Sequence, residues 1–257
     1  MQKAHAKLSA SGSARWIACP GSVVLEALFD DEGSAYAEEG TLAHSVAEIR
    51  VRARIHPESF MIGARLHDTE MTTEPEMWAF AGLYEDYCGN LIDTMRLEGH
   101  TVRAYVEQRV CFDKWVPGGF GTVDFCAVGG DDLHIVDFKY GKGVPVSAES
   151  NSQMRAYALG FLQEMECIYD NIKTVTVHIV QPRIRNYSSE TMTTEELLDW
   201  ANTVLKPSAE TASKQTRRYA PGRHCRFCKA ATVCKARTHE LLSRLAEVLS
   251  GGKDNAD

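Results

Sequence analysis

The chain has 257 residues and a formal net charge of −7, from 28 lysines and arginines against 35 aspartates and glutamates. Its length suits one large domain or two small ones, and its composition of 44% hydrophobic and 25% charged residues is that of a folded globular protein. No apolar stretch approaches the ~20 residues of a membrane span. The N-terminus lacks the apolar core of a signal peptide, so we expect a cytoplasmic protein.

Residues 1–100 predict mainly helices. Apolar side chains such as Leu42 and Val46 recur at helical spacing over residues 38–55, and a second pattern of this kind covers residues 74–98. The period then changes from helical to alternating, which indicates strands.

The first predicted strand covers residues 101–110, with Val106 and Val110 among the apolar residues of its buried face. Two further strands are predicted at residues 120–128 and 133–138, joined by a four-residue turn.

Residues 149–165 predict a helix, and residues 174–180 predict a strand rich in β-branched side chains. Thr193, with Glu196 three residues later, predicts a capping box that opens another helix. The expected fold class is therefore α/β, with a small mixed β-sheet flanked by helices.

Two carboxylates and a lysine lie in neighbouring predicted strands. Asp124 belongs to one strand, and Asp137 and Lys139 end the next, where they share a face because side chains alternate. We expect both carboxylates at one sheet edge, where they can bind Mg²⁺ or Mn²⁺. A lysine beside them can stabilise an attacking water or the charge that develops at phosphorus. An Asp-x-Lys tripeptide alone also occurs by chance in strands that end at the surface.

Other polar side chains accompany this group. His44 and Glu48 lie four residues apart on one predicted helix, Gln153 and Tyr157 lie four apart on another, and Glu107 belongs to the first strand. A single histidine or a Gln/Tyr pair is more often structural than functional. Their order along the chain is what points to chemistry.

That order resembles the RecB-like nucleases of the PD-(D/E)xK superfamily. Their pattern is a histidine on an early helix, an aspartate in one strand, Asp-x-Lys in the next, and Gln-x-x-x-Tyr on the following helix; here the match covers about residues 40–157. The resemblance implies a restriction-endonuclease-like core and metal-dependent hydrolysis of DNA. It implies as metal ligands His44, Asp124, Asp137 and the backbone carbonyl of Phe138.

As catalytic or supporting residues the resemblance implies Asp124, Asp137, Lys139, Gln153 and Tyr157. Lys139 would position the attacking water, and Gln153 and Tyr157 would support the site and contact DNA. Glu48 and Glu107 are weaker candidates, expected to support the ligands or the fold.

Three of the eight cysteines, Cys225, Cys228 and Cys234, form a C-x2-C-x5-C pattern. Thiolates two residues apart in a turn can bind one metal ion or one edge of a cluster, and cysteines in an unexported chain favour metal binding over disulfides. Cys19 stands before a Pro-Gly break. The other four are expected to be buried as small hydrophobic residues: Cys88, Cys111, Cys126 and Cys167.

A distant upstream cysteine followed by C-x2-C-x5-C resembles the iron–sulfur RecB-like nucleases, which include AddB and CRISPR-associated relatives. The resemblance implies a [4Fe–4S] cluster held by Cys19, Cys225, Cys228 and Cys234. Such a cluster would join segments 206 residues apart in sequence. Zinc is the alternative, with His224 able to replace one ligand.

Residues 214–237 contain eight basic and no acidic residues, while the remainder of the chain has 20 basic and 35 acidic residues. This basic segment predicts phosphate contacts. The candidate DNA-binding residues are Arg217, Arg218, Arg223, Arg226 and Lys229. Tyr219 and Phe227 can stack on unpaired bases; alternatively, Phe227 shields the cluster.

The expected organisation is a single RecB-like domain over residues 1–250 with a disordered tail at residues 251–257. The domain comprises a helical part (1–100), a nuclease core (101–205) and a cysteine-rich basic segment (214–237).

The predicted function is a metal-dependent DNA exonuclease that acts on ends or single strands in recombination, replication or repair. The sequence contains no G-x-x-x-x-G-K-[ST] loop, so we expect no helicase motor and no nucleotide cofactor. The chain resembles stand-alone phage and prophage modules of this group, which implies the bacterial host cytoplasm and a single-strand annealing or other recombination protein as partner. The alternatives are a non-catalytic nucleic-acid-binding subunit and a zinc-containing regulator.

Overall fold

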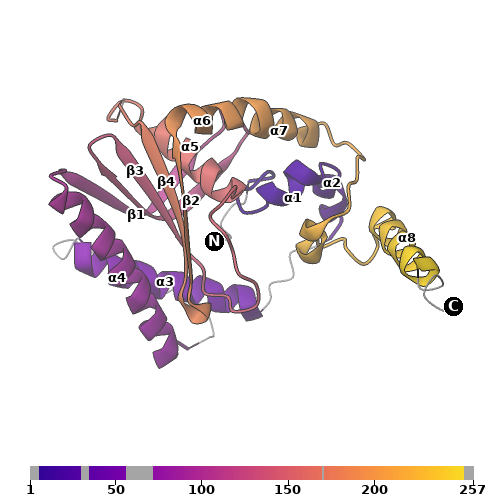
Figure 1. The fold of residues 1–257 in the computed structure, drawn as a ribbon, viewed down its shortest axis with the longest axis horizontal. Helices are drawn as coiled ribbons and strands as arrows, with labels where there is room; N and C mark the ends of the chain where they lie inside the picture. The colour runs from indigo at the N-terminus through magenta and orange to yellow at the C-terminus, as the bar shows by residue number, and fades with distance from the viewer. Residues whose placement is uncertain (1–5, 30–34, 56–71, 170, 252–257) are drawn as a thin grey trace.

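The computed structural model describes residues 6–29, 35–55, 72–169 and 171–251. These residues form an α/β fold in which helices cover both faces of one five-stranded mixed sheet (Figure 1). None of the helices in the described ranges is long and apolar enough to cross a lipid bilayer. The predicted tail lies outside the described residues apart from Gly251, which ends a helix.

The strands follow one another across the sheet in chain order. They are β1 (Val102–Cys111), β2 (Phe120–Gly129), β3 (Asp132–Phe138), β4 (Thr174–Gln181) and β5 (Asn186–Thr193). β3 and β4 are parallel and the other neighbours are antiparallel. A parallel pair needs a crossover connection, which helix α5 (Ser152–Met165) provides. The expected α/β class with a mixed sheet is confirmed.

Two layers of helices enclose the sheet (Figure 1). On one face lie α3 (Ala35–Ile55) and α4 (Pro75–Leu97), which confirm the two long helices predicted from periodicity. On the other face lie α5, α6 (Thr194–Trp200) and α7 (Lys206–Ser213). Two short helical turns connect elements: η2 (Pro182–Ile184) joins β4 to β5, and η3 (Ala201–Leu205) joins α6 to α7.

Each face of the sheet buries a separate apolar core, and β3 contributes to both. Leu133 and Ile135 pack under α5, whereas Val136 and Phe138 pack under α3 and α4. Because side chains alternate along a strand, Asp137 follows Leu133 and Ile135 onto the α5 face. The hydrophobic effect that fixes this register therefore also fixes the direction of a candidate catalytic carboxylate.

The side-chain alternation of β1 and β2 is interrupted at one level of the sheet. In β1, Val106 packs under α3 and α4, whereas Val110 packs into the opposite core; in β2, Val123 and Phe125 are likewise two apart and lie in opposite cores. At this level Glu107 has φ of 51°, a left-handed conformation that non-glycine residues rarely adopt. The prediction that Val106 and Val110 share one buried face was wrong, because the side chains change faces of the sheet between them.

Three local predictions are refined by the structure. The turn between β2 and β3 has two residues rather than four, because Gly129 pairs with Asp132 and Gly130 adopts φ of 63°. α5 begins at Ser152 rather than residue 149, because the Asn151 side chain caps it by accepting two backbone N–H bonds. The capping box at the start of α6 is confirmed.

Strand β5 was not predicted, because its sequence is almost entirely polar. It is an edge strand on which most side chains are exposed or half-buried. Its pairing with β4, rather than its own hydrophobicity, therefore accounts for its conformation.

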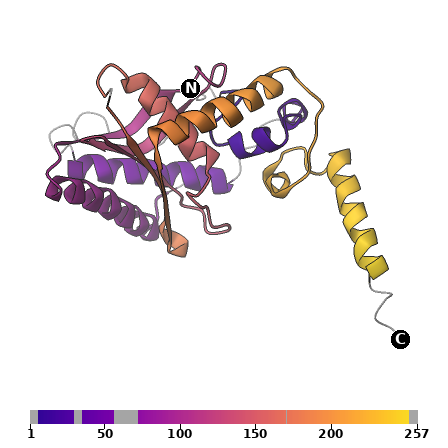
Figure 2. The same cartoon turned by 45° about the horizontal axis from the view of Figure 1, so that its top comes forward.

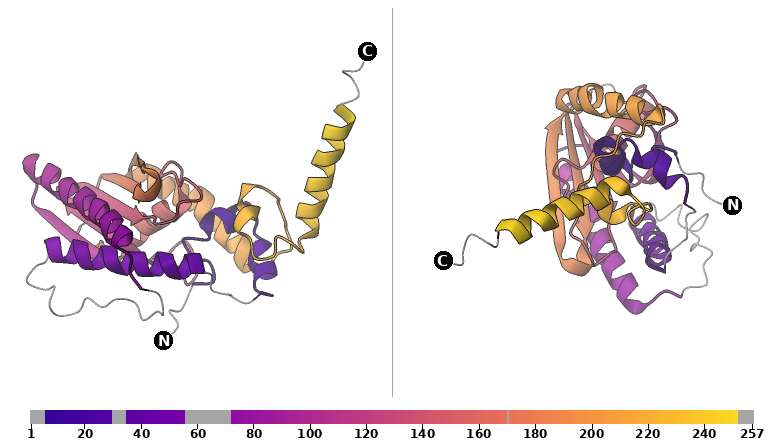
Figure 3. Two further views of the ribbon diagram at one scale, coloured as in Figure 1. Left: turned by 90° about the horizontal axis from the view of Figure 1, so that it is seen from below. Right: turned by 90° about the vertical axis from the view of Figure 1, so that its right-hand side faces the viewer.

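The ends of the described chain lie to one side of the sheet. α1 (Ser13–Ala18) and α2 (Ser22–Glu26) lie beside the short helix η4 (Arg223–Phe227) (Figure 1). α8 (Lys235–Gly251) extends away from both helical layers (Figures 2 and 3). Its exposed apolar side chains are Leu241, Leu242, Leu245, Val248 and Leu249.

Candidate active site and cysteine cavity

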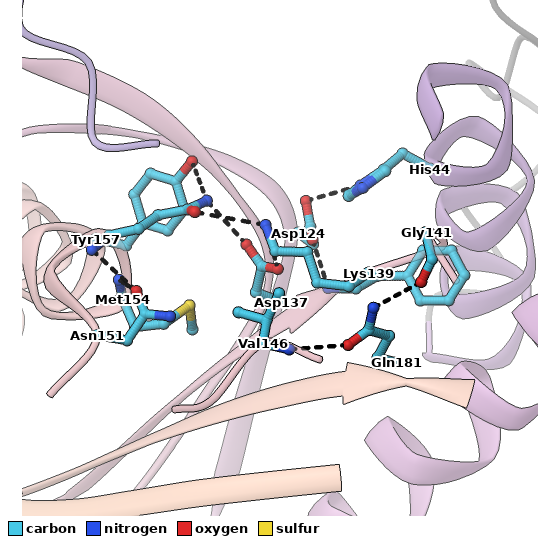
Figure 4. A network of polar contacts seen from close by, with 12 residues as sticks. His44, Asp124, Asp137, Lys139, Gly141, Val146, Asn151, Met154, Tyr157 and Gln181 are labelled. Atoms are coloured by element: carbon cyan, nitrogen blue, oxygen red, sulfur yellow. Dashed lines mark hydrogen bonds and ion pairs between the residues drawn. The ribbon is translucent and has the colours of Figure 1, made fainter. Parts of the chain in front are cut away.

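The polar side chains of the predicted site gather where β2 and β3 diverge (Figure 4). Phe125 pairs with Val136, and Asp124 and Asp137 are the next residues on the two strands beyond this pair. β2 and β3 are interior strands. The two carboxylates therefore lie next to each other as expected, with Asp124 in the middle of β2 and Asp137 near the end of β3, between the two helical layers.

Asp124 contacts both an α3 side chain and the β3 backbone. Its Oδ1 lies 3.1 Å from His44 Nδ1, and its Oδ2 accepts a hydrogen bond from the Phe138 N–H at 2.8 Å. Burial alone would lower the pKa of His44, but the Asp124 carboxylate raises it to about 9. Burial alone would raise the pKa of Asp124, but the charge of His44 brings it below its usual value. In the chain by itself, the two side chains therefore form an ion pair at neutral pH.

Asp137 and Lys139 form a second ion pair, which α5 supports. Lys139 Nζ lies 2.9 Å from Asp137 Oδ2 and donates to Gln153 Oε1 at 3.4 Å. Gln153 Nε2 donates to Asp137 Oδ1 at 3.1 Å and to the Tyr157 hydroxyl at 3.2 Å. A single amide thus contacts the carboxylate, the ammonium group and the phenol, and it fixes their relative positions.

Asp137 is only 3% exposed. Burial raises its pKa above the usual value, although the Lys139 ammonium group opposes this increase. Burial alone would lower the pKa of Lys139, but the Asp137 carboxylate raises it. Apart from its ion pair with Lys139, Asp137 Oδ2 has no hydrogen-bond partner among the described residues. A buried carboxylate oxygen in this state is suited to bind a cation.

The Tyr157 ring packs directly against Gly121 of β2. A Cβ atom on Gly121 would lie 2.6 Å from Tyr157 Cε1, closer than carbon atoms approach. Burial raises the pKa of the Tyr157 hydroxyl well above its usual value, so this group stays protonated at neutral pH. Gly121 therefore sets how closely α5 and its polar residues approach β2.

Glu107 is a site residue that the sequence ranked too low. In the antiparallel register of β1 and β2, Glu107 lies opposite Asp124, between two pairs of facing residues. Its carboxylate, a ring nitrogen of His44 and a carboxylate oxygen of Asp124 all lie within 4.8 Å of one another. Glu107 has a left-handed backbone conformation, and its side chain lies with those of His44 and Asp124. Neither hydrophobic periodicity nor a motif predicts such a conformation at a glutamate.

Glu48, the other weak candidate, bonds to a neighbour on its own helix. Arg52 Nε donates to Glu48 Oε1 at 2.8 Å, and Arg52 Nη2 donates to the Val106 carbonyl at 2.9 Å. Glu48 therefore orients an arginine that holds the β1 backbone next to Glu107.

The donor set fits a hard divalent cation. His44, Glu107 and Asp124 offer one imidazole and two carboxylates at mutual distances suited to one ion, which matches the ligand preferences of Mg²⁺ and Mn²⁺. Asp137, with its incompletely bonded oxygen, adjoins this group through Lys139 and β3. The carbonyl of Phe138 stays a predicted ligand.

The loop that follows Lys139 is fixed from β4. Gln181 is 2% exposed; its Nε2 donates to the carbonyls of Gly141 and Val144 at 2.6 and 3.0 Å, and its Oε1 accepts from the Val146 N–H at 3.1 Å (Figure 4). A buried amide whose donors and acceptor are all used holds a loop rigidly. Gln181 therefore stabilises the exit of the chain from the candidate active site.

A second group of chemically active residues surrounds a cavity between the N-terminal helices and the basic segment. The cavity is lined in part by Cys19, Cys225, Cys228 and Cys234, together with Ser22 and His224. All four cysteines that the resemblance assigned to a cluster thus meet at one place.

Backbone N–H groups point at two of these sulfur atoms. The Ala220 N–H donates to Cys19 Sγ at 3.5 Å, and the Gly222 N–H donates to Cys225 Sγ at 3.4 Å. The Gly21 N–H donates to the Arg218 carbonyl at 2.9 Å and joins the two segments. N–H groups of this kind stabilise thiolates, the form in which cysteine binds metal.

Charged side chains strengthen the same junction. Arg15 Nε donates to Glu26 Oε2 at 2.8 Å, Glu26 Oε1 accepts from the Lys229 N–H at 2.8 Å, and Arg15 Nη1 donates to the Phe227 carbonyl at 3.0 Å. Helices α1 and α2 therefore hold the loop that contains Cys225 and Cys228.

The spacing of the sulfur atoms bears on what they can bind. A tetrahedral zinc ion would bring four sulfurs within roughly 3.8 Å of one another. In the described chain, the cysteines share a cavity but do not form a group with all ligand atoms within 4.8 Å, as His44, Glu107 and Asp124 do. The four thiols therefore lie further apart in this structure than the ligands of one bound zinc ion.

The predicted DNA-binding residues are all exposed. They are Arg217, Arg218, Arg223, Arg226 and Lys229. The two aromatic residues of the segment differ from the expectation. Tyr219 lines the cysteine cavity and packs against Gly21, whereas Phe227 is 64% exposed. The alternative that Phe227 shields this position is not supported, because Phe227 does not line the cavity and Tyr219 does.

The remaining cysteines lie elsewhere. Cys88 and Cys126 are buried as predicted, Cys111 is half-buried, and Cys167 is exposed. The prediction for Cys167 was wrong because α5 ends at Met165 and the chain turns outward there.

Comparison with known proteins gives a family and similar solved structures. The model of the family described as "Protein of unknown function (DUF2800)" matches residues 5–250. A solved structure titled "Crystal structure of SSO0001" is similar at 12% sequence identity and a TM-score of 0.39, covering 92% of this chain and 89% of its own. A similarity of this extent carries no argument about function.

Proposed function

This chain belongs to the DUF2800 family, and we propose that it is a metal-dependent DNA nuclease of the RecB-like, PD-(D/E)xK type. The observation that carries the proposal is one contact network. Residues from α3, β2, β3 and α5 that lie up to 113 positions apart, from His44 to Tyr157, contact one another through short polar interactions around Asp124 and Asp137.

In this proposal His44, Glu107 and Asp124 bind Mg²⁺ or Mn²⁺. Asp137 is a further carboxylate beside these ligands. The bound ion would supply Lewis-acid chemistry, polarising a phosphate oxygen and making water more acidic. Lys139 Nζ, fixed by Asp137 and Gln153, orients the attacking water and stabilises the negative charge that develops at phosphorus.

We further propose that the cysteine cavity holds a [4Fe–4S] cluster, on the support of the four cysteines that line it. Its role is structural, because it links α1 and α2 to the segment after α7. The exposed arginines of that segment supply phosphate contacts, and exposed Phe227, with Arg226 5.6 Å from its ring, offers a stacking surface for a base.

The test is a nuclease assay on the full chain purified without oxygen. End-labelled linear single strands, linear duplexes and circular DNA are incubated with Mg²⁺ or Mn²⁺. We expect cleavage of linear substrates, and circles that stay intact would establish exonuclease action. Asp124→Asn should abolish cleavage, whereas Asp131→Asn, in the exposed turn between β2 and β3, should not.

Two results would contradict the proposal in different ways. If Asp124→Asn cleaves as well as the unmodified chain, the assigned site is wrong. If DNA binds but is cut with neither ion, the chain is a non-catalytic nucleic-acid-binding subunit. Metal analysis is a separate test of the cluster: zinc without iron in the anaerobic protein would exclude it.

A further inference from the structure

Ser22 is a buried hydroxyl in the wall of the cysteine cavity. It is the first residue of α2 and is 2% exposed. Within the described residues its Oγ atom has no hydrogen-bond partner. A hydroxyl removed from water without a partner is unfavourable, so an unpaired one in a native fold calls for an explanation.

A second buried serine nearby shows the usual situation. Ser13 in α1 is 1% exposed, and its Oγ lies 2.6 Å from Ser152 Oγ. Ser22 differs from Ser13 in that it lines the cavity, together with the apolar side chains of Leu25 and Ala231. The acceptors that share the cavity with Ser22 include the sulfur atoms of four cysteines, two of which already receive backbone N–H bonds.

We propose that the Ser22 hydroxyl donates a hydrogen bond to a sulfur atom of the cluster held by Cys19, Cys225, Cys228 and Cys234. This inference rests on the cluster in the proposed function and assigns a role to a residue outside the cysteine pattern. It explains why a polar side chain occupies this buried position.

The bond has an electronic consequence. Hydrogen bonds to the sulfurs of an iron–sulfur cluster stabilise its reduced, more negative state and raise its reduction potential. Ser22 acts in the same sense as the N–H groups of Ala220 and Gly222. It is therefore a positioning and tuning residue rather than a ligand.

The test is a redox titration of the cluster absorbance in the full chain, prepared without oxygen. We expect Ser22→Ala to keep its iron and sulfide content but to show about a tenfold lower ratio of reduced to oxidised cluster at a fixed potential, which corresponds to about 59 mV for one electron. Ser22→Thr retains the hydroxyl and should titrate like the unmodified chain. Ser13→Ala, a buried serine outside the cavity, controls for packing.

The outcomes separate this inference from the proposed function. An intact cluster with an unchanged potential in Ser22→Ala overturns the role of Ser22 and leaves the cluster in place. An equal shift in Ser13→Ala also overturns it, because a general packing change would then be the cause. A chain that binds zinc and no iron overturns both the cluster and this inference, whereas nuclease activity is judged separately by Asp124→Asn.

Discussion

The two chemically active regions are built in opposite ways. At the candidate active site, strands and helices bring together polar groups that bond mainly to one another, as Gln153 does with Asp137, Lys139 and Tyr157. At the cysteine cavity, short helices and loops bring together four sulfurs around a space, and the Ser22 hydroxyl lacks a partner. The first region is organised by the sheet, whereas the second is held by hydrogen bonds between α1, α2 and the segment after α7.

The largest expected effect is a loss of DNA cleavage that leaves the cysteine cavity unchanged. Lys139→Met should reduce DNA cleavage by about 10³-fold, because it removes the cation that stabilises the developing charge, while the iron content stays unchanged. The matched control is Lys173→Met, which removes a lysine paired with Asp131 at 2.8 Å on the surface. Steady-state cleavage rates and iron analysis on both variants decide the result; a loss of iron in Lys139→Met would show that the regions are not independent.

The next effect concerns stability and belongs to the cysteine cavity. Cys228→Ala should lose the cluster and release the segment after α7. Closing the loop between Cys19 and Cys228 opposes folding by roughly 5 kcal/mol of chain entropy, which the cluster would offset. Limited proteolysis should then remove a C-terminal fragment and leave the sheet intact. Cys167→Ala, which changes an exposed cysteine, should retain both iron and resistance to protease. If the Cys228 variant resists cleavage equally, the ends are held without a cluster.

A smaller effect tests how the sheet organises the active site. Gly121→Ala would place a methyl group 2.6 Å from Tyr157 and push α5 away from β2. The rate of cleavage should fall about 10- to 100-fold, because a shift of about 1 Å in catalytic groups has an effect of this size. Gly141→Ala adds a methyl group where no atom lies within 4 Å and should cleave normally. Equal rates for the two variants would show that the position of Tyr157 does not matter.

The smallest effect is a pH dependence that arises outside both regions. His178 is 6% exposed and lies 3.0 Å from Tyr87 and from His134. Burial, reinforced by His134, lowers the pKa of His178 to about 3. Its contribution to stability is thus fully present above about pH 6.5 and is lost as the pH falls towards 3, because the unfolded chain takes up the proton first.

The free energy of unfolding should therefore fall with acidification by up to about 1.4 kcal/mol per pH unit for this group. Denaturant titrations at pH 7, 6 and 5 should give a shallower slope for His178→Gln than for the unmodified chain, while His239→Gln, at an exposed position of α8, should match the unmodified chain. An unchanged slope in His178→Gln would assign the acid sensitivity to other groups.

The sequence predicted the parts of the fold that follow from periodicity. The patterns around Leu42 and along β3 were enough for two helices and a central strand, and the order of His44, Asp124, Asp137, Lys139 and Gln153 identified residues that the structure brings into contact. These assignments succeed because alternation and helical spacing are local. The roles of these residues in catalysis stay predictions.

What the sequence missed depends on tertiary context. β5 is a strand because β4 pairs with it, Tyr219 packs against Gly21 from the other end of the chain, and Ser22 lines a cavity built from both ends of the chain. None of these facts is encoded in a window of neighbouring residues. Glu107 was ranked too low for the same reason, since its proximity to His44 and Asp124 arises only in the folded chain.

The conformation of Glu107 implies a conflict between durability and chemistry. A left-handed backbone at a non-glycine residue costs on the order of 1 kcal/mol or more, and glycine at this position would relieve that cost. Selection for a sturdier protein alone would therefore favour glycine at position 107, whereas selection for cation binding would keep the carboxylate. The chain has glutamate. The backbone at this position is therefore less stable with glutamate than it would be with glycine. A substitution that stabilised it would remove the proposed cation ligand.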